Sequence, residues 1–121
     1  MQFAQKNFYK KLLGRIGEKE AVSYLKKQGY AIVEKNYRNL FGEIDIIAKD
    51  GEYTVFTEVK TRTGEEFGAP SEAVDYRKRQ KYVKIAQAYL ASKGLTDSAC
   101  RFDVIEIENG KINHIKDACS V

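Results

Sequence analysis

Apolar and polar positions alternate with a period of two in the middle of the chain, which is typical of β-strands. Residues 42–48 and 53–62 are rich in β-branched and aromatic side chains and are separated by the turn sequence Lys-Asp-Gly-Glu. This arrangement predicts a β-hairpin. Residues 30–38 alternate in the same way just before it, so they predict a first strand at the edge of the sheet or next to it.

The segments on either side carry apolar residues at helical spacing. Residues 1–28 repeat Leu, Ile, Ala and Tyr three and four positions apart, and Gly29 supplies the end of the predicted helix. A second helix is predicted over residues 70–92, with Gly94 as its end. Residues 63–69 contain two glycines and few aliphatic side chains, which predicts a mobile loop, a candidate for gripping substrate or for ordering on binding.

The last part of the chain predicts a second hairpin. Residues 101–108 and 111–116 flank Asn109-Gly110, a strong hairpin signal, and the first of these strands has apolar residues on both faces, so we expect it to be internal. The order is helix, three strands, helix, two strands. It predicts an α/β layered fold with a central mixed sheet flanked by helices, formed by a single domain over residues 1–121.

Charged residues interrupt the first of the two central strands. Because positions two apart share a face of a strand, Glu43 and Asp45 are expected to point one way, and Ile44 and Ile46 the other.

The second central strand is interrupted in the same way. Glu58 and Lys60 share a face with Phe56. If the polar faces of the two strands coincide, Asp45, Glu58 and Lys60 converge. An unpaired buried charge is costly, so these groups must be paired, bind a metal or face water.

A pair of carboxylates is a site for a hard divalent cation. Mg²⁺ typically takes one or two carboxylates, keeps several waters and accepts phosphate oxygens. A nearby lysine can orient or deprotonate a water, or steady a phosphate. The pattern therefore fits metal-assisted hydrolysis of a phosphodiester. A ladder of salt bridges on a solvated face explains the spacing equally well, and the residues alone leave both interpretations open.

The same residues carry a resemblance to known proteins. Asp45, followed a hairpin later by Glu58-Val59-Lys60, resembles the PD-(D/E)XK nuclease signature, and residues 42–48 with 55–62 resemble more closely the YraN-like family of small bacterial proteins. That family is similar to Holliday junction resolvases and other restriction-endonuclease-like folds. Further matches to the YraN-like pattern occur along nearly the whole chain: Gly17-Glu18, Ala21, Tyr24-Leu25, Gly29-Tyr30, Asn36-Tyr37-Arg38, Phe67-Gly68, Pro70, Glu72-Ala73-Val74, Lys78 and Arg101-Phe102-Asp103-Val104.

Two positions depart from the expected patterns. Ile44 stands where the nuclease signature has proline, which the YraN-like pattern allows, and Thr57 stands where an aliphatic residue is more usual. The second departure slightly weakens the apolar face of that strand.

The resemblance implies a restriction-endonuclease-like fold and a Mg²⁺- or Mn²⁺-dependent endodeoxyribonuclease. Asp45 and Glu58 would hold the metal, with Glu43 as an additional candidate ligand. Lys60 would orient the attacking water, and Glu18 is an auxiliary catalytic candidate.

Glu18 has two interpretations. It lies at the edge of the apolar stripe of the first helix, where a surface acid would pair locally with Arg15 or Lys26. Related resolvases place a glutamate from the first helix beside the strand carboxylates, so the resemblance favours a role for Glu18 as a metal or water ligand.

The second helix carries the densest group of basic residues: Arg77, Lys78, Arg79, Lys81 and Lys84. Phosphate contact and a solvated charged face explain this group equally well, and the resemblance favours DNA contact for Lys78, Arg79 and Lys81. Arg38 and Arg62, which lie near strand ends, are further candidates for nucleic-acid binding.

Composition narrows the function classes. The net charge is +4 and the sequence pI is about 9.0, which suits an anionic partner.

Cys100 and Cys119 show neither a disulfide framework nor paired metal-ligand spacing and are interpreted as reduced thiols, although the sequence leaves a single bridge open. His114 is alone and expected on the surface, and Asp103 is expected to be structural, paired with Arg101 or a lysine. No apolar run approaches membrane-spanning length and no signal peptide is visible, so we expect a cytoplasmic protein with no membrane partner.

These observations predict a Mg²⁺- or Mn²⁺-dependent DNA endonuclease that hydrolyses phosphodiester bonds, with branched or junction DNA as substrate on analogy of fold. Cleavage of a junction would imply a homodimer. The alternative is a non-catalytic nucleic-acid-binding protein of the same fold, in which the acids are only structural. A protein-interaction module, the third interpretation, predicts neither metal binding nor salt-dependent DNA binding.

Overall fold

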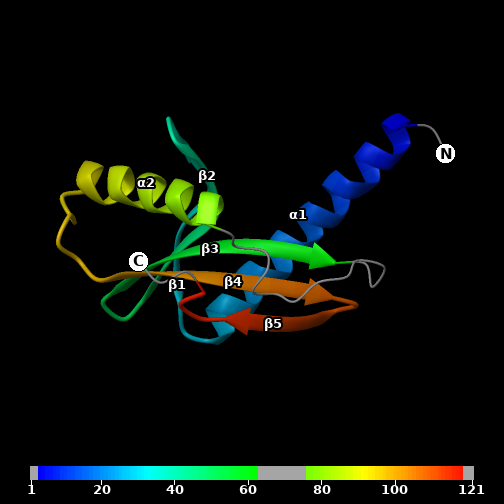
Figure 1. The fold of residues 1–121 in the computed structure, drawn as a ribbon. Coiled ribbons are helices and arrows are strands. Elements are labelled where there is room, and N and C mark those ends of the chain that lie inside the picture. Colours follow the sequence, from blue (N-terminus) through cyan, green and yellow to red (C-terminus); the bar gives the residue numbers. More distant parts are fainter. Residues whose placement is uncertain (1–2, 63–75, 119–121) are drawn as a thin grey trace.

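The computed structural model describes residues 3–62 and 76–118, with side chains from residue 11 onward (Figure 1). The predicted loop at 63–69, the predicted helix start at 70–75 and Cys119 lie outside the described residues. The described elements are α1 (Phe3–Lys27), β1 (Ala31–Asn39), β2 (Gly42–Asp50), β3 (Tyr53–Arg62), α2 (Tyr76–Ser92), β4 (Cys100–Glu108) and β5 (Lys111–Ile115).

The five strands form one mixed sheet in the order β1-β2-β3-β4-β5. Neighbouring strands are antiparallel except β3 and β4, which are parallel and are joined through α2. Both predicted hairpins are present, β1 lies at the edge and β4 is internal, as the sequence predicted. The predicted class, an α/β layered fold with a mixed sheet flanked by helices, is therefore confirmed.

The two helices cover opposite faces of the sheet. On one face Ala21 and Leu25 of α1 pack against a cluster that includes Val55 of β3. On the other face Ile85 of α2 packs against a cluster that includes Phe56. Since Val55 and Phe56 are consecutive, the alternation of β3 places one apolar layer on each side of the sheet (Figure 1).

Strand β2 breaks the predicted alternation at Asp45. Ile44 belongs to the cluster beneath α2 and Ile46 to the cluster beneath α1, so the prediction that they share a face was wrong. The pairing of β2 with β3 ends at Ile46 and Thr57. Across β1, Asn36 has a φ of +54°, a conformation that asparagine tolerates better than most residues. Asp45 thus lies between two irregular stretches of backbone: Asn36 on β1, and the end of the regular pairing with β3.

Helix α1 lies close against the sheet at Gly17. This residue is buried, and a Cβ placed on it would lie 2.2 Å from Oγ1 of Thr61 on β3. The missing side chain therefore allows the helix to sit against β3, and it fixes the next residue, Glu18, near the sheet.

A buried polar network ties β4 to β5 and α1. Nε2 of His114 lies 2.6 Å from Oδ2 of Asp103, Nε of Arg101 donates to Oδ1 of Asp103 at 3.0 Å, and Nδ1 of His114 lies 3.0 Å from the hydroxyl of Tyr24. Burial alone would raise the pKa of Asp103, but the hydrogen bonds from His114, Arg101 and the backbone of Asp117 hold it below its usual value. The predicted pairing of Asp103 with Arg101 is confirmed. The prediction of a surface position for His114 was wrong, because its side chain is only 4% exposed.

Neither described helix combines the length and the apolar character needed to cross a membrane. Cys100 is a half-buried free thiol, and burial raises its pKa.

Candidate functional site

Asp45 is the centre of the candidate site. Its Oδ2 accepts a hydrogen bond of 2.8 Å from the backbone N–H of Val59, which compensates for the end of the β2–β3 pairing at this point. Burial, above all, raises the pKa of Asp45 from 3.8 to about 6. The hydrogen bond from Val59 opposes this effect, whereas the carboxylates of Glu18, Glu58 and Glu43 add to it.

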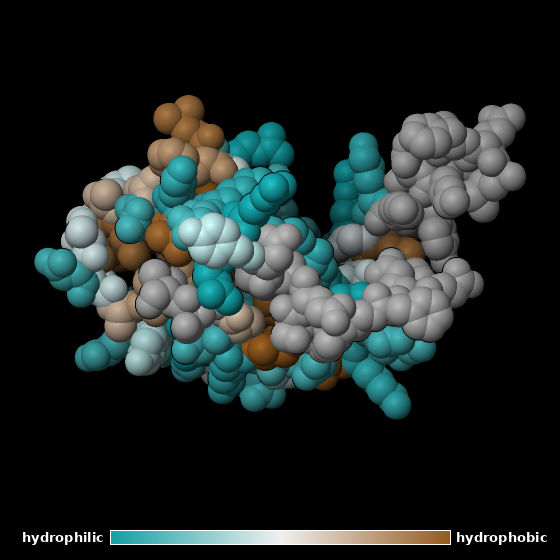
Figure 2. Space-filling model, viewed as in Figure 1, coloured by the Kyte–Doolittle hydropathy of each residue, from teal (hydrophilic) through white to brown (hydrophobic). Residues whose placement is uncertain are grey.

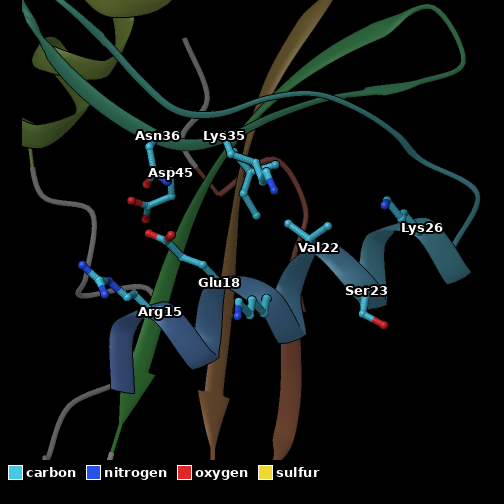
Figure 3. A pocket seen from close by; sticks show the side chains of 10 residues that line it. Arg15, Glu18, Val22, Ser23, Lys26, Lys35, Asn36 and Asp45 are labelled. Carbon is cyan, nitrogen blue, oxygen red and sulfur yellow. The ribbon is translucent and has the colours of Figure 1, made fainter. Parts of the chain in front are cut away.

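A cavity of about 490 Å³ opens beside Asp45, between α1 and strands β1 and β2. The carboxylates of Glu18 and Asp45 point toward one another in this cavity, below Asn36 (Figure 3). The side-chain amide of Asn36 lies 3.2 and 3.3 Å from the two carboxylate oxygens of Glu18 when its nitrogen faces them, as a donor must. The first helix therefore brings a glutamate beside the β2 aspartate, as the resemblance implied.

The wall of this cavity is mixed in character. Val22 and Ile46 supply apolar surface. Four cationic side chains also line it: Arg15, Lys19, Lys26 and Lys35. Two carboxylates and four cationic side chains thus line the same cavity, a combination that attracts an anionic ligand toward a site suited to a cation.

Glu58 and Lys60 lie together on β3. Nζ of Lys60 is 3.6 Å from Oε1 of Glu58, and their side chains are 31% and 17% exposed, respectively. The other oxygen, Oε2 of Glu58, is buried and has no hydrogen-bond partner among the described residues. A buried carboxylate oxygen without a partner is costly, so this atom is a candidate position for a bound cation or an ordered water.

The structure divides the predicted carboxylates into three positions. Asp45 and Glu18 share the cavity, whereas Glu58 pairs with Lys60 on the face that also carries Phe56. Glu58 is still close enough to raise the pKa of Asp45. Glu43 is exposed, and its Oε2 is 2.8 Å from Nη2 of Arg38.

These carboxylates do not form a complete metal-binding site by themselves. In residues 3–62 and 76–118, no three histidine, cysteine or acidic side chains are grouped closely enough to hold a metal ion. A site built here would use one or two carboxylates and complete its shell with water and substrate, which is the usual arrangement for Mg²⁺.

The residues predicted to bind nucleic acid also differ in their surroundings. Arg79 and Lys81 are exposed on α2, and Lys78 is half-buried. Arg38 is exposed while paired with an acid on the neighbouring strand. Arg62 is the least suited to phosphate, because its side chain is 14% exposed and its Nε is 2.9 Å from Oε2 of Glu106.

Sequence reasoning did not select Asn36, Lys19 or Lys35 as site residues, although all three line the cavity. One signal was present at Asn36. Asparagine is uncommon within strands and tolerates a left-handed backbone, so its place in a predicted strand indicated an irregularity.

Comparison with known proteins gives consistent matches over most of the chain. The model of a family described as Uncharacterised protein family UPF0102 matches residues 17–107, a span that includes Glu18, Asp45, Glu58 and Lys60. A UPF0102 protein of Caldanaerobacter subterraneus subsp. tengcongensis is 50% identical over 120 residues, covering 93% of this chain and 98% of the relative. One from Thermodesulfovibrio yellowstonii is 51% identical over 106 residues, or 88% and 94% of the two chains. One from Clostridium acetobutylicum is 48% identical over 108 residues, or 89% and 86%.

Proposed function

This chain belongs to the uncharacterised protein family UPF0102, the YraN-like family that its motifs resemble, and we propose that it is a metal-dependent endonuclease that hydrolyses phosphodiester bonds in DNA. The proposed cofactor is Mg²⁺ or Mn²⁺, and the proposed location is the cytoplasm.

One observation carries this proposal: buried negative charge that the described residues leave uncompensated. Asp45 has a pKa of about 6 because it is buried near the carboxylates of Glu18 and Glu58, and Oε2 of Glu58 has no partner in the described part of the chain. A fold that only needed stability would gain by neutralising such groups. Asp45 borders the cavity and Glu58 lies close enough to raise the pKa of Asp45, so a divalent cation bound by both carboxylates would compensate this charge.

Each residue of the site would then have a distinct role. Asp45 and Glu58 would hold the metal, which when bound supplies a Lewis acid for the phosphate oxygens. Lys60, with Nζ 3.6 Å from Glu58, would orient the attacking water. Glu18 would bind a different water of the metal, on the α1 side of the sheet, because its carboxylate points toward Asp45 in the cavity. The cations of the cavity wall would attract the phosphate backbone.

The proposed substrate is branched or junction DNA, and this choice rests on analogy of fold. Two-fold symmetric cutting of a junction would require two copies of the site, so the proposal includes a homodimer on that substrate.

The test is cleavage of labelled duplex, single-stranded, flap and four-way-junction DNA in Mg²⁺, Mn²⁺ or EDTA. We expect cutting that requires metal and that falls by at least about 100-fold in Glu58→Gln, because one carboxylate ligand is lost. Binding of the same DNA in EDTA should change little, since Glu58 is not a phosphate contact. Equal cutting by the wild type and Glu58→Gln would reject the site, and so would cutting that is indifferent to EDTA.

A second candidate function is nucleic-acid binding without cleavage. Four basic side chains of α2 are exposed whether or not the acids bind metal: Arg77, Arg79, Lys81 and Lys84. In that case no DNA is cut, and neutralising Lys81 and Lys84 together weakens binding and lowers the slope of log affinity against log salt by roughly one to two.

A further inference from the structure

The turn between β1 and β2 exposes two large apolar side chains. Leu40 is 97% exposed and Phe41 is 44% exposed. Tight turns between strands usually carry glycine, asparagine or aspartate, because those residues suit the backbone and face water without cost. Figure 2 shows hydrophobic side chains at the end of this hairpin.

The turn is held in place from below. Oδ1 of Asn39 accepts a hydrogen bond of 2.9 Å from the backbone N–H of Phe41, and Nδ2 of Asn39 donates to the carbonyl of Ile85 on α2 at 3.2 Å. On the other side of the turn, a Cβ placed on Gly42 would lie 2.4 Å from Cε of Lys81. The exposed apolar pair is therefore anchored on α2 and presented in a fixed position, which reduces the entropy cost of using it in binding.

The surroundings of the turn are basic. Arg38, although paired with Glu43, has a side chain that is 76% exposed, and Lys81 packs against the turn itself. Arg77, Arg79 and Lys84 are exposed on the same helix. Cations around a projecting apolar pair suit a polyanion that also offers flat apolar surfaces, and stacked bases between phosphates have both properties.

We infer that Leu40 and Phe41 form a wedge that inserts between neighbouring base pairs when the protein binds DNA. The choice of DNA rests on the proposed function, whereas the wedge itself rests on the geometry of the turn. Insertion of apolar side chains into a base step unstacks and kinks the duplex.

The position of the wedge relative to the cutting site follows from the strand. Leu40 lies five positions before Asp45, in the turn that leads into β2, so at about 3.3 Å per residue their Cα atoms are at most roughly 17 Å apart. With a rise of 3.4 Å per base pair, the wedge should enter within about five base pairs of the phosphate next to Asp45. This spacing would favour substrates that are already open or flexible at that distance from the cut.

The test uses 2-aminopurine, a base analogue whose fluorescence rises when it is unstacked, placed at successive positions of four-way-junction and duplex DNA. Full-length protein is added in EDTA, so binding is seen without cleavage. We expect a rise of about three-fold or more, confined to one or two neighbouring positions. Leu40→Thr should remove most of that rise and change affinity by less than about ten-fold. Val33→Thr is the matched control, because Val33 is 48% exposed on the same hairpin but away from its turn, and it should behave as wild type.

The outcomes separate the wedge from the proposed function. Metal-dependent cleavage without any local unstacking, or with the same unstacking in Leu40→Thr, overturns the wedge and leaves the nuclease proposal standing. Unstacking that depends on Leu40, with no cleavage in any metal, supports the wedge on a DNA-binding protein. A dimer that dissociates in Leu40→Thr but not in Val33→Thr, as seen by sedimentation, identifies the turn as an interface between copies and overturns the wedge. Absence of any DNA binding overturns both proposals.

Discussion

Replacing Asp45 by asparagine should stabilise the protein in the absence of metal. The pKa of Asp45 is raised from 3.8 to about 6 in the folded state, so the folded protein binds this proton more tightly than the unfolded chain does. Stability therefore falls as the pH rises from about 4 through 6, as the carboxylate ionises inside the fold. Asparagine keeps an oxygen that can accept the hydrogen bond from Val59 but carries no charge.

The size of the effect follows from the shift. About two pKa units correspond to at most about 3 kcal/mol at pH 8, where Asp45 is ionised in both states. At pH 4.5 the same relation gives a loss of folding stability of about 1 kcal/mol in the wild type. At this pH Asp45 is protonated in the folded protein, and the unfolded chain, in which Asp45 has its usual pKa, must take up a proton to fold. Asp45→Asn should thus be more stable than wild type by about 2 to 3 kcal/mol at pH 8, and this advantage should shrink by about 2 kcal/mol at pH 4.5.

The assay is urea unfolding in EDTA at both pH values, followed by circular dichroism. Glu43→Gln is the control, since Glu43 is an exposed acid paired with Arg38 and its loss should change stability by less than about 0.5 kcal/mol. The reasoning is refuted if Asp45→Asn is less stable than wild type at pH 8, or if its effect is the same at both pH values. The first result would make the Asp45 carboxylate a stabilising structural group, and the second would mean that folding does not raise the pKa of Asp45.

Two further substitutions test how the site is held. Gly17→Ala places a Cβ 2.2 Å from a β3 hydroxyl oxygen and should lower the free energy of unfolding by about 1 to 3 kcal/mol. Gly14→Ala is the control: its Cβ would meet no described atom within 4 Å apart from the adjoining backbone of its own helix, and it should raise the free energy of unfolding by up to about 1 kcal/mol. Urea unfolding measures both, and a gain of stability in each would contradict the close packing of α1 on β3. His114→Ala removes the 2.6 Å contact between Nε2 of His114 and the buried carboxylate of Asp103, and it should lower the free energy of unfolding by about 2 to 4 kcal/mol. Lys111→Ala on the same strand should cost less than about 0.5 kcal/mol, and an equally small effect of His114→Ala would contradict the buried network.

The sequence predicted the elements well because their signals are local. Residues 42–62 carry two alternating strands around a short turn, and Asn109-Gly110 marks the second hairpin, so neither hairpin depends on distant parts of the chain. The internal position of β4 also followed from its composition, since a strand with apolar residues on both faces must be covered on both sides.

The site was less accessible to sequence reasoning because its geometry depends on tertiary contacts. Period-two alternation assumed that β2 stays regular at Asp45, but the carboxylate takes the N–H of Val59 and the strand changes face there. In the same way, spacing made Arg62 a candidate for DNA contact, whereas its ion pair with Glu106 on β4 depends on the parallel β3–β4 register. The sequence pattern therefore identified the acidic residues and the lysine, whereas the contacts that these residues make depend on the tertiary structure.

Binding of Mn²⁺, measured by isothermal titration calorimetry at pH 7.5, tests the central claim most directly. The account predicts one saturable site in the wild type that weakens by at least about ten-fold in Asp45→Asn and in Glu58→Gln, and that is unchanged in Glu43→Gln. Absence of saturable binding in the wild type, or equal binding by all three variants, would contradict the account.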